Sequence, residues 1–240
     1  MSNPFFKRSQ LDFFYPQFDK ITTAHYSPAF ERGMAEELAE TDVIARQSAD
    51  ATFENTIVAM EKSGQLLQRV RPVFFNLVSA HTNDELEAIR SELAPKLAAH
   101  KDKILLNETL FKRIQHIYEQ RAELPLDAES KRLIEEYYRR FVRAGALLSE
   151  ANKERLRVNN AQTARLQTAF SQNVLKEVNE LAIVIDSRQE LAGCSDTVIQ
   201  SAAEKASARD LSGKYVIPLL NTSGQPSLSH LENRGLRERI

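Results

Sequence analysis

Residues 126–181 contain a single glycine and no proline, and this stretch constrains the fold more than any other part of the chain. Apolar side chains recur in it at steps of three and four residues, which is the spacing of one helix face. Gly145 interrupts the pattern, and glycine costs little in the left-handed conformation that ends a helix. Ser149 then offers a good N-cap. The stretch predicts two long helices, at about 127–144 and 149–181.

The apolar side chains of these two helices form one stripe on each helix, and the positions between them are mostly charged or amide. Its members are Leu133, Tyr137, Phe141, Ala144 and Leu148, followed by Leu156, Leu166, Phe170, Val174, Val178 and Leu181. A stripe of this kind serves packing and carries no catalytic chemistry.

The composition is that of a globular protein, with 42% hydrophobic and 27% charged residues among 240. Seven glycines and eight prolines are too few for the frequent turns of an all-β sandwich, so long helices are favoured. The net charge of −1 argues against nucleic acid as a partner. The densest basic cluster, Arg139, Arg140 and Arg143, follows Glu135 and Glu136, so we expect a solvated, salt-bridged helix face.

Cys194 is the only cysteine, so the chain can form no intramolecular disulfide and no cysteine-based zinc site. The N-terminal sequence MSNPFFKRSQLDFF lacks the apolar core of a signal peptide. No run of residues approaches the roughly 18 apolar residues that span a bilayer. These features predict a cytoplasmic protein that has no membrane partner.

Residues 1–24 form an aromatic but aperiodic segment, and residues 25–240 read as one helical domain. The aromatic residues of the segment are Phe5, Phe6, Phe13, Phe14, Tyr15 and Phe18. We expect this arm to fill surface grooves of the helical body, and the alternative is a motif that binds a partner.

Helix start and stop signals divide the region before Pro125. The expected helices begin at Ser27–Pro28, at Thr52, at the capping box of Thr82 with Glu85, and at Asn107. Gly64 should break the second of these helices, and Pro72 and Pro95 should kink or restart the helices that cross them.

After Leu181 the pattern changes to short β-branched runs near 182–186 and 214–219. These predict two short paired strands with a helix at about 195–208 between them. A last helix is expected from Ser227, and it is still running at Ile240, so the chain reads as truncated.

No catalytic or metal-binding constellation is recognisable in the chain, and substrate-binding residues cannot be assigned. The five histidines are His25, His81, His100, His116 and His230. None belongs to an H-E-x-x-H or E-x-x-H pair, so we expect surface or capping roles. The chain also lacks a G-x-S-x-G elbow, a Walker loop and a G-x-G-x-x-G loop. Cys194 could be an activated thiolate near a helix N-terminus, but a buried or incidental thiol is the better interpretation.

Several short segments, taken together, nonetheless carry a resemblance to a known family. These segments are Thr52–Ile57, Arg140–Ala146, Leu191–Gly193, Asn233–Arg234 and Arg237–Glu238. With them the chain resembles the N-terminal part of the thimet-oligopeptidase-like zinc peptidases, a family that includes neurolysin. Further segments are most similar to the bacterial peptidyl-dipeptidase branch of that family: Asn3–Phe5, Phe18–Ile21, Ala80–Leu86 and Val216–Thr222.

The resemblance implies a mostly α, multi-helix N-terminal domain of a zincin oligopeptidase. In that family, zinc lies at the floor of a deep channel and is held by an H-E-x-x-H helix and a later glutamate, all beyond position 240. The chain would then be truncated before the catalytic domain and would form the channel wall and lid. Zinc would belong to the parent enzyme and not to this fragment, which would be inactive alone, and the partners would be short peptides and the catalytic half. The rival hypothesis is a stand-alone helical protein-interaction module.

Overall fold

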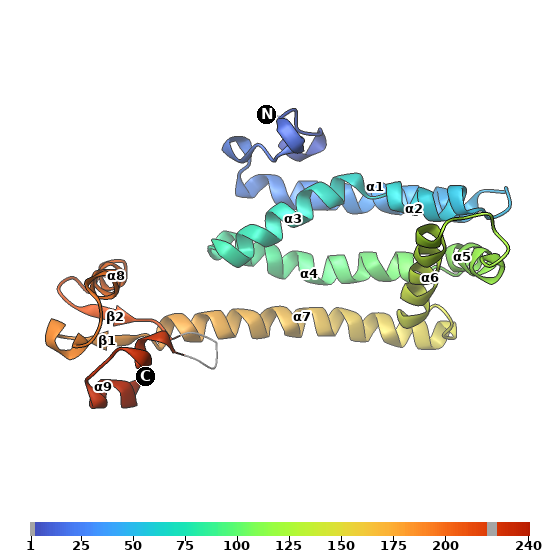
Figure 1. The fold of residues 1–240 in the computed structure, drawn as a ribbon. Helices are drawn as coiled ribbons and strands as arrows, with labels where there is room; N and C mark the ends of the chain where they lie inside the picture. Colours follow the sequence, from blue (N-terminus) through green and yellow to red (C-terminus); the bar gives the residue numbers. More distant parts are fainter. Residues whose placement is uncertain (1–2, 220–224) are drawn as a thin grey trace. The chain divides into compact units, whose positions relative to one another are not determined.

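The computed structural model describes residues 3–219 and 225–240 (Figure 1). The described part of the chain is mostly helical and has one two-stranded antiparallel sheet, as the sequence predicts. It forms two compact units, the first ending at Thr168 and the second comprising Ala169–Ile240. The segment 216–222, one of those on which the family resemblance rests, lies partly outside the described residues.

The first unit consists of helices joined by short turns. Its elements are α1 (Tyr26–Arg46), a π-helical turn (Phe53–Val58) that continues into α2 (Ala59–Lys62), α3 (Gln65–Ala80), α4 (Asp84–Leu105), α5 (Glu108–Gln120), α6 (Ala128–Arg143) and the start of α7 (Glu150–Glu180). Helix α1 packs against α3, α4 and α5, and α5 packs against α6. The long α7 agrees with the helix expected over 149–181.

Two apolar clusters hold the first unit together. In one cluster, the rings of Phe30 and Phe74 meet edge to face with centroids 5.4 Å apart, and both side chains are fully buried. In the other, Ile114 from α5 packs with Ile134 and Phe141 from α6. Full burial of each such side chain contributes about 1.5–3 kcal/mol, so the apolar stripe of α6 fixes that helix in the unit.

The turn between α6 and α7 is made by Gly145, which has φ +101°. The Ala146 amide donates a hydrogen bond to the Phe141 carbonyl at 3.0 Å, which satisfies a carbonyl at the end of α6. A Cβ at position 145 would lie 2.7 Å from a terminal carbon of Leu156 and 2.9 Å from one of Leu148. The helix break predicted at this glycine is confirmed, and the site has little room for a side chain.

The aromatic arm is only partly packed. Phe5 is buried, with its ring centroid 5.6 Å from that of Tyr26, and Arg69 donates to its carbonyl oxygen at 3.2 Å. Phe13, in contrast, is 98% exposed, and it has φ +55°. The expectation that the arm fills surface grooves therefore holds for Phe5 and is wrong for Phe13.

Helix starts differ from the sequence prediction at two places. Helix α1 begins at Tyr26, because a turn at Thr23–His25, capped by Thr22, leads directly into it. Helix α4 is capped by Asn83, whose side chain accepts from the Leu86 amide at 2.9 Å, instead of by Thr82. Asparagine is at least as good an N-cap as threonine, so the start moves by one residue.

The sequence predicted either a kink or a restart of the helix at each of the two internal prolines. The structure excludes the restart. Helix α3 runs through Pro72 and α4 runs through Pro95 as single helices. Proline removes one backbone hydrogen bond from a helix. Val70 and Phe74, on either side of Pro72, are fully buried, and so is Leu93 before Pro95, so packing close to both prolines stabilises the helices.

The second unit is built around the predicted strands. Strand β1 (Ile183–Ile185) pairs antiparallel with β2 (Tyr215–Ile217), and Val184 faces Val216 in the register. Helix α8 (Asp196–Ser207) packs on β2 and is capped by Ser195, as expected. The apolar core of this unit comprises Ile185, Leu191, Ile199, Ala202, Ile217, Leu231 and Leu236.

The continuous helix expected from Ser227 is wrong. A 3-10 turn at Pro226–Ser229 is followed by α9 (Arg234–Arg239). Asn233 starts α9 by accepting from the Leu236 amide at 3.1 Å. Because Leu231 is buried between the two pieces, the chain turns inward at this residue.

Gly193 and Gly213 provide a matched test of the second unit, since their φ angles are +87° and +85°. A Cβ at 193 would overlap the backbone carbonyl of His230, whereas one at 213 would meet nothing within 4 Å. In both alanine variants, the left-handed backbone should lower the free energy of unfolding by about 1–2 kcal/mol. We expect Gly193→Ala to lose clearly more than Gly213→Ala in urea unfolding, and equal losses would contradict the packing of residues 192–193 against 230–232.

Candidate functional site

The structure assigns different roles to the histidines. The His25 ring accepts from the Thr22 amide at 3.0 Å and so caps a turn. His81, His116 and His230 are exposed. His100 is the exception, because it is 7% exposed and lies inside the first unit, and the expectation of a surface or capping role is wrong for it.

Cys194 is a free, half-buried thiol that packs against the core of the second unit. Burial raises the pKa of this thiol, which favours the protonated form over a reactive thiolate. The geometry therefore supports a packing role.

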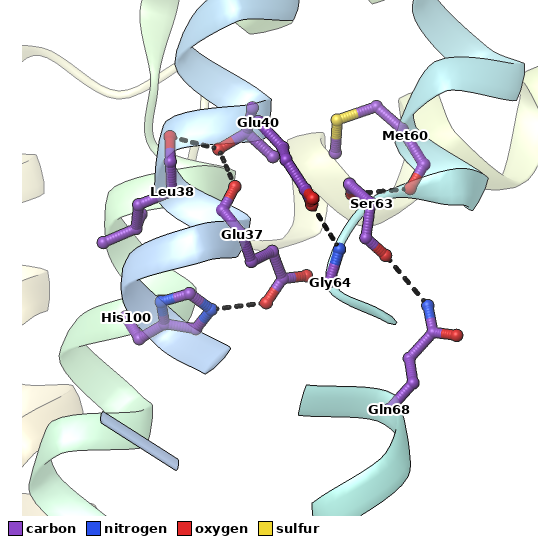
Figure 2. A network of polar contacts seen from close by, with 9 residues as sticks. Glu37, Leu38, Glu40, Met60, Ser63, Gly64, Gln68 and His100 are labelled. Carbon is purple, nitrogen blue, oxygen red and sulfur yellow. Dashed lines mark hydrogen bonds and ion pairs between the residues drawn. The ribbon is translucent and has the colours of Figure 1, made fainter. Parts of the chain in front are cut away.

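Figure 2 shows a network of polar contacts that joins α1, α4 and the turn between α2 and α3. At its centre, Nε2 of His100 on α4 lies 2.6 Å from a carboxylate oxygen of Glu37 on α1. One turn further along α1, the carboxylate of Glu40 accepts from the Gly64 amide at 2.7 Å. Gly64 has φ +69°, so the backbone can turn its amide toward α1.

The turn itself is held by its own hydrogen bonds (Figure 2). The Ser63 hydroxyl donates to the Met60 carbonyl at 2.7 Å, and the Gln68 side chain donates to the Ser63 carbonyl at 3.0 Å. The break predicted at Gly64 is confirmed, and these bonds give it a fixed geometry.

The network forms one side of a cavity of about 510 Å³. Its lining includes Glu37, Glu61, Gln68, Arg71, His100, Lys101, Tyr137, Arg140 and Phe141. The Tyr137 hydroxyl donates to a carboxylate oxygen of Glu61 at 2.5 Å. Burial and this hydrogen bond raise the pKa of Tyr137 above its ordinary value of 10.0, so the phenol is neutral at physiological pH.

His100 has one ring nitrogen, Nδ1, that is buried with no hydrogen-bond partner among the residues that the structure describes. An ionised carboxylate can only accept, so the ring donates to Glu37 through Nε2. The two hydroxyls that line the 510 Å³ cavity, those of Ser63 and Tyr137, donate to Met60 and Glu61 instead of pairing with this histidine. The arrangement thus resembles a structural hydrogen-bonded pair more than a nucleophile and its base.

The sequence did contain a signal for this pair. His100 follows Leu93 and Leu97 at helical spacing, and Glu37 follows Phe30 and Met34 in the same way. Polar residues on an apolar stripe are buried and need partners. The pairing itself could not be predicted from the sequence, because the two residues are separated by 63 positions.

Across residues 3–219 and 225–240, no group of three or more His, Cys, Asp or Glu side chains is arranged to hold a metal ion. The zinc ligands that the family resemblance implies are expected beyond position 240. In the same part of the chain, no helix is long and apolar enough to cross a membrane.

Removing one partner of the buried pair should be costly. In Glu37→Leu, the His100 ring keeps its place but loses its acceptor, and an unsatisfied buried group costs about 1–3 kcal/mol. Glu37→Gln retains an acceptor oxygen and should lose less. A double-mutant cycle with His100→Leu, measured by urea unfolding, should give a coupling energy above about 0.5 kcal/mol. A coupling energy near zero would show that the contact contributes nothing to stability.

The raised pKa of Tyr137 predicts a loss of stability at high pH. Above about pH 10 the phenol ionises in the unfolded chain but stays protonated in the folded one, so proton release favours unfolding. Stability should therefore fall as the pH rises beyond 10, and Tyr137→Phe should reduce the slope. The measurement is the free energy of unfolding of both proteins between pH 8 and about 11. Identical slopes would refute a buried, protonated Tyr137.

No family model matches this chain. It is 42% identical over 238 residues to dipeptidyl carboxypeptidase of Escherichia coli K12, a match that covers 99% of this chain and 35% of that protein. The corresponding Salmonella typhimurium protein is 41% identical over 239 residues, with 100% and 35% covered. Oligopeptidase A of Escherichia coli K12 is 23% identical over 240 residues, again with 100% and 35% covered.

The matched region of these relatives is their N-terminal part, and the chain spans about a third of their length. The branch suggested by the sequence is confirmed by the higher identity to the dipeptidyl carboxypeptidases. Over its whole length, this chain is therefore related to the N-terminal part of the dipeptidyl carboxypeptidase and oligopeptidase A peptidases.

Proposed function

We propose that this chain is the N-terminal part of a peptidase that releases dipeptides from the C-termini of short peptides, and that its helices form a wall of the substrate channel. The observation that carries the proposal is the 42% identity to dipeptidyl carboxypeptidase across 99% of the chain. The match covers 35% of that relative. By the proposal, the catalytic residues and the zinc ion belong to the remaining part of the full-length peptidase, and the present chain alone is inactive.

The surface of α7 supports the wall role. Leu166 and Phe170, both on the apolar stripe, are 61% and 70% exposed, and Val158 is 59% exposed. Large apolar side chains gathered on one helix normally have a covering partner. In the proposed enzyme the catalytic part covers this stripe, and the wall restricts entry to short, extended peptides.

A second candidate function is a stand-alone interaction module. It is favoured by the arm, where Phe13 is 98% and Tyr15 63% exposed. Such a module would bind a partner through these rings and would need no catalytic part. The two functions differ in whether the chain can complete a working peptidase.

The test is a chimaera in which this chain replaces the matched 35% of Escherichia coli dipeptidyl carboxypeptidase. We expect the purified chimaera to release dipeptides from an N-acetylated tetrapeptide, as resolved by chromatography, while this chain alone with added zinc releases none. The same peptide with an amidated C-terminus is the control, since it offers no terminal carboxylate.

Two outcomes would count against the proposal. Dipeptide release by the chain alone would place a catalytic set within these residues. A chimaera that is folded by circular dichroism, yet as inactive as the relative lacking its matched part, would show that this chain does not build the channel wall.

A further inference from the structure

A second cavity, of about 380 Å³, is lined by the last turns of α4 and the second half of α6. It adjoins the cavity beside His100, because both are lined by Lys101, Leu105 and Arg140. The full lining is Lys101, Leu105, Glu136, Arg139, Arg140, Arg143 and Ala144. Four cationic side chains thus share a small hollow with a single carboxylate.

The single carboxylate, that of Glu136, already forms ion pairs. Glu136 lies 2.5 Å from the Arg132 guanidinium and 3.1 Å from that of Arg139. Lys101, Arg140 and Arg143, in contrast, have no ion pair within 4.0 Å among the described residues. Arg140 and Arg143 are exposed, as expected for a solvated face, but among the described residues only Arg139 of the three arginines forms an ion pair, so the hollow carries positive charge that no carboxylate within 4.0 Å balances.

The dipole of helix α6 accounts for two of these cations but not for Lys101. Arg140 and Arg143 lie in the last turn, where the helix dipole favours cations. Both side chains are exposed, so water satisfies their guanidinium donors in the free chain, and a bound anion would replace that water. Lys101 lies in α4 and adds positive charge at the same hollow.

Arg140 contacts a buried aromatic ring, although its own side chain is exposed. Its guanidinium carbon lies 5.1 Å from the centroid of the Tyr137 ring, and Tyr137 is buried and anchored to Glu61. This cation–π contact favours positions of the guanidinium beside the hollow.

We propose that this cavity binds a small polyanion that carries two or three carboxylate or phosphate groups. Three unmatched cations from two helices fit several anionic groups better than one, and arginine forks match the oxygens of both chemistries. The volume of about 380 Å³ suits a small molecule. Anion binding here does not rest on the proposed peptidase activity.

The test is isothermal titration of the chain with citrate and with pyrophosphate at constant ionic strength. We expect saturable binding of one anion per chain, and the preferred anion identifies carboxylate or phosphate as the chemistry. The double variant Lys101→Gln/Arg143→Gln should weaken binding at least about tenfold, because it removes two of the three cations that have no ion pair among the described residues.

The matched control is Lys103→Gln/Arg155→Gln, which removes the same charge from exposed positions on α4 and α7 outside the cavity. It should bind like the unmodified chain. Arg140→Lys keeps the charge but loses the planar fork, and we expect an intermediate loss of affinity. Equal weakening in both double variants would reveal diffuse charge attraction and overturn the proposal, as would the absence of saturable binding for both anions.

Discussion

The left-handed turn at Gly145 is the constraint on which the rest of the first unit depends. It ends α6 at the point where Phe141 has reached the core, and it starts α7 in a new direction. The two helices carry similar apolar stripes, but their surroundings differ. Phe141 is fully buried, whereas Phe170 is 70% exposed. One turn thus separates α6, whose apolar stripe reaches the core, from α7, whose apolar stripe is partly exposed.

Local signals in the sequence were sufficient for much of the fold. Gly145 and Gly64 break helices through their own backbone freedom, and Asn107 and Ser195 cap helices through their own side chains. Each of these effects depends on a few neighbouring residues, so it can be read without the fold. The helices did not restart at the prolines in α3 and α4, one of the two predicted outcomes, because burial of nearby side chains such as Phe74 and Leu93 offsets one lost hydrogen bond.

The candidate sites were harder to predict because their members meet through tertiary packing. Glu37 and His100 stand on helical apolar stripes, a sign of burial that the expected surface or capping role of His100 overlooked, and their pairing depends on the fold. The basic cluster on α6 was visible, yet only the structure shows that Glu136 satisfies Arg139 while Lys101 joins the remaining arginines. Charge in a sequence gives the number of ionic groups, and their partners depend on the fold.

Val158, Leu166 and Phe170 on α7 are exposed in the described part of the chain, and in the proposed peptidase the remaining part of the enzyme covers them. Hydrogen exchange at the backbone amides of residues 158–175 tests this most directly, comparing the chain alone with the chimaera that supplies the catalytic part of the relative. The account predicts rapid exchange in the chain alone and strong protection in the chimaera. Exchange that is equally rapid in both proteins would contradict it.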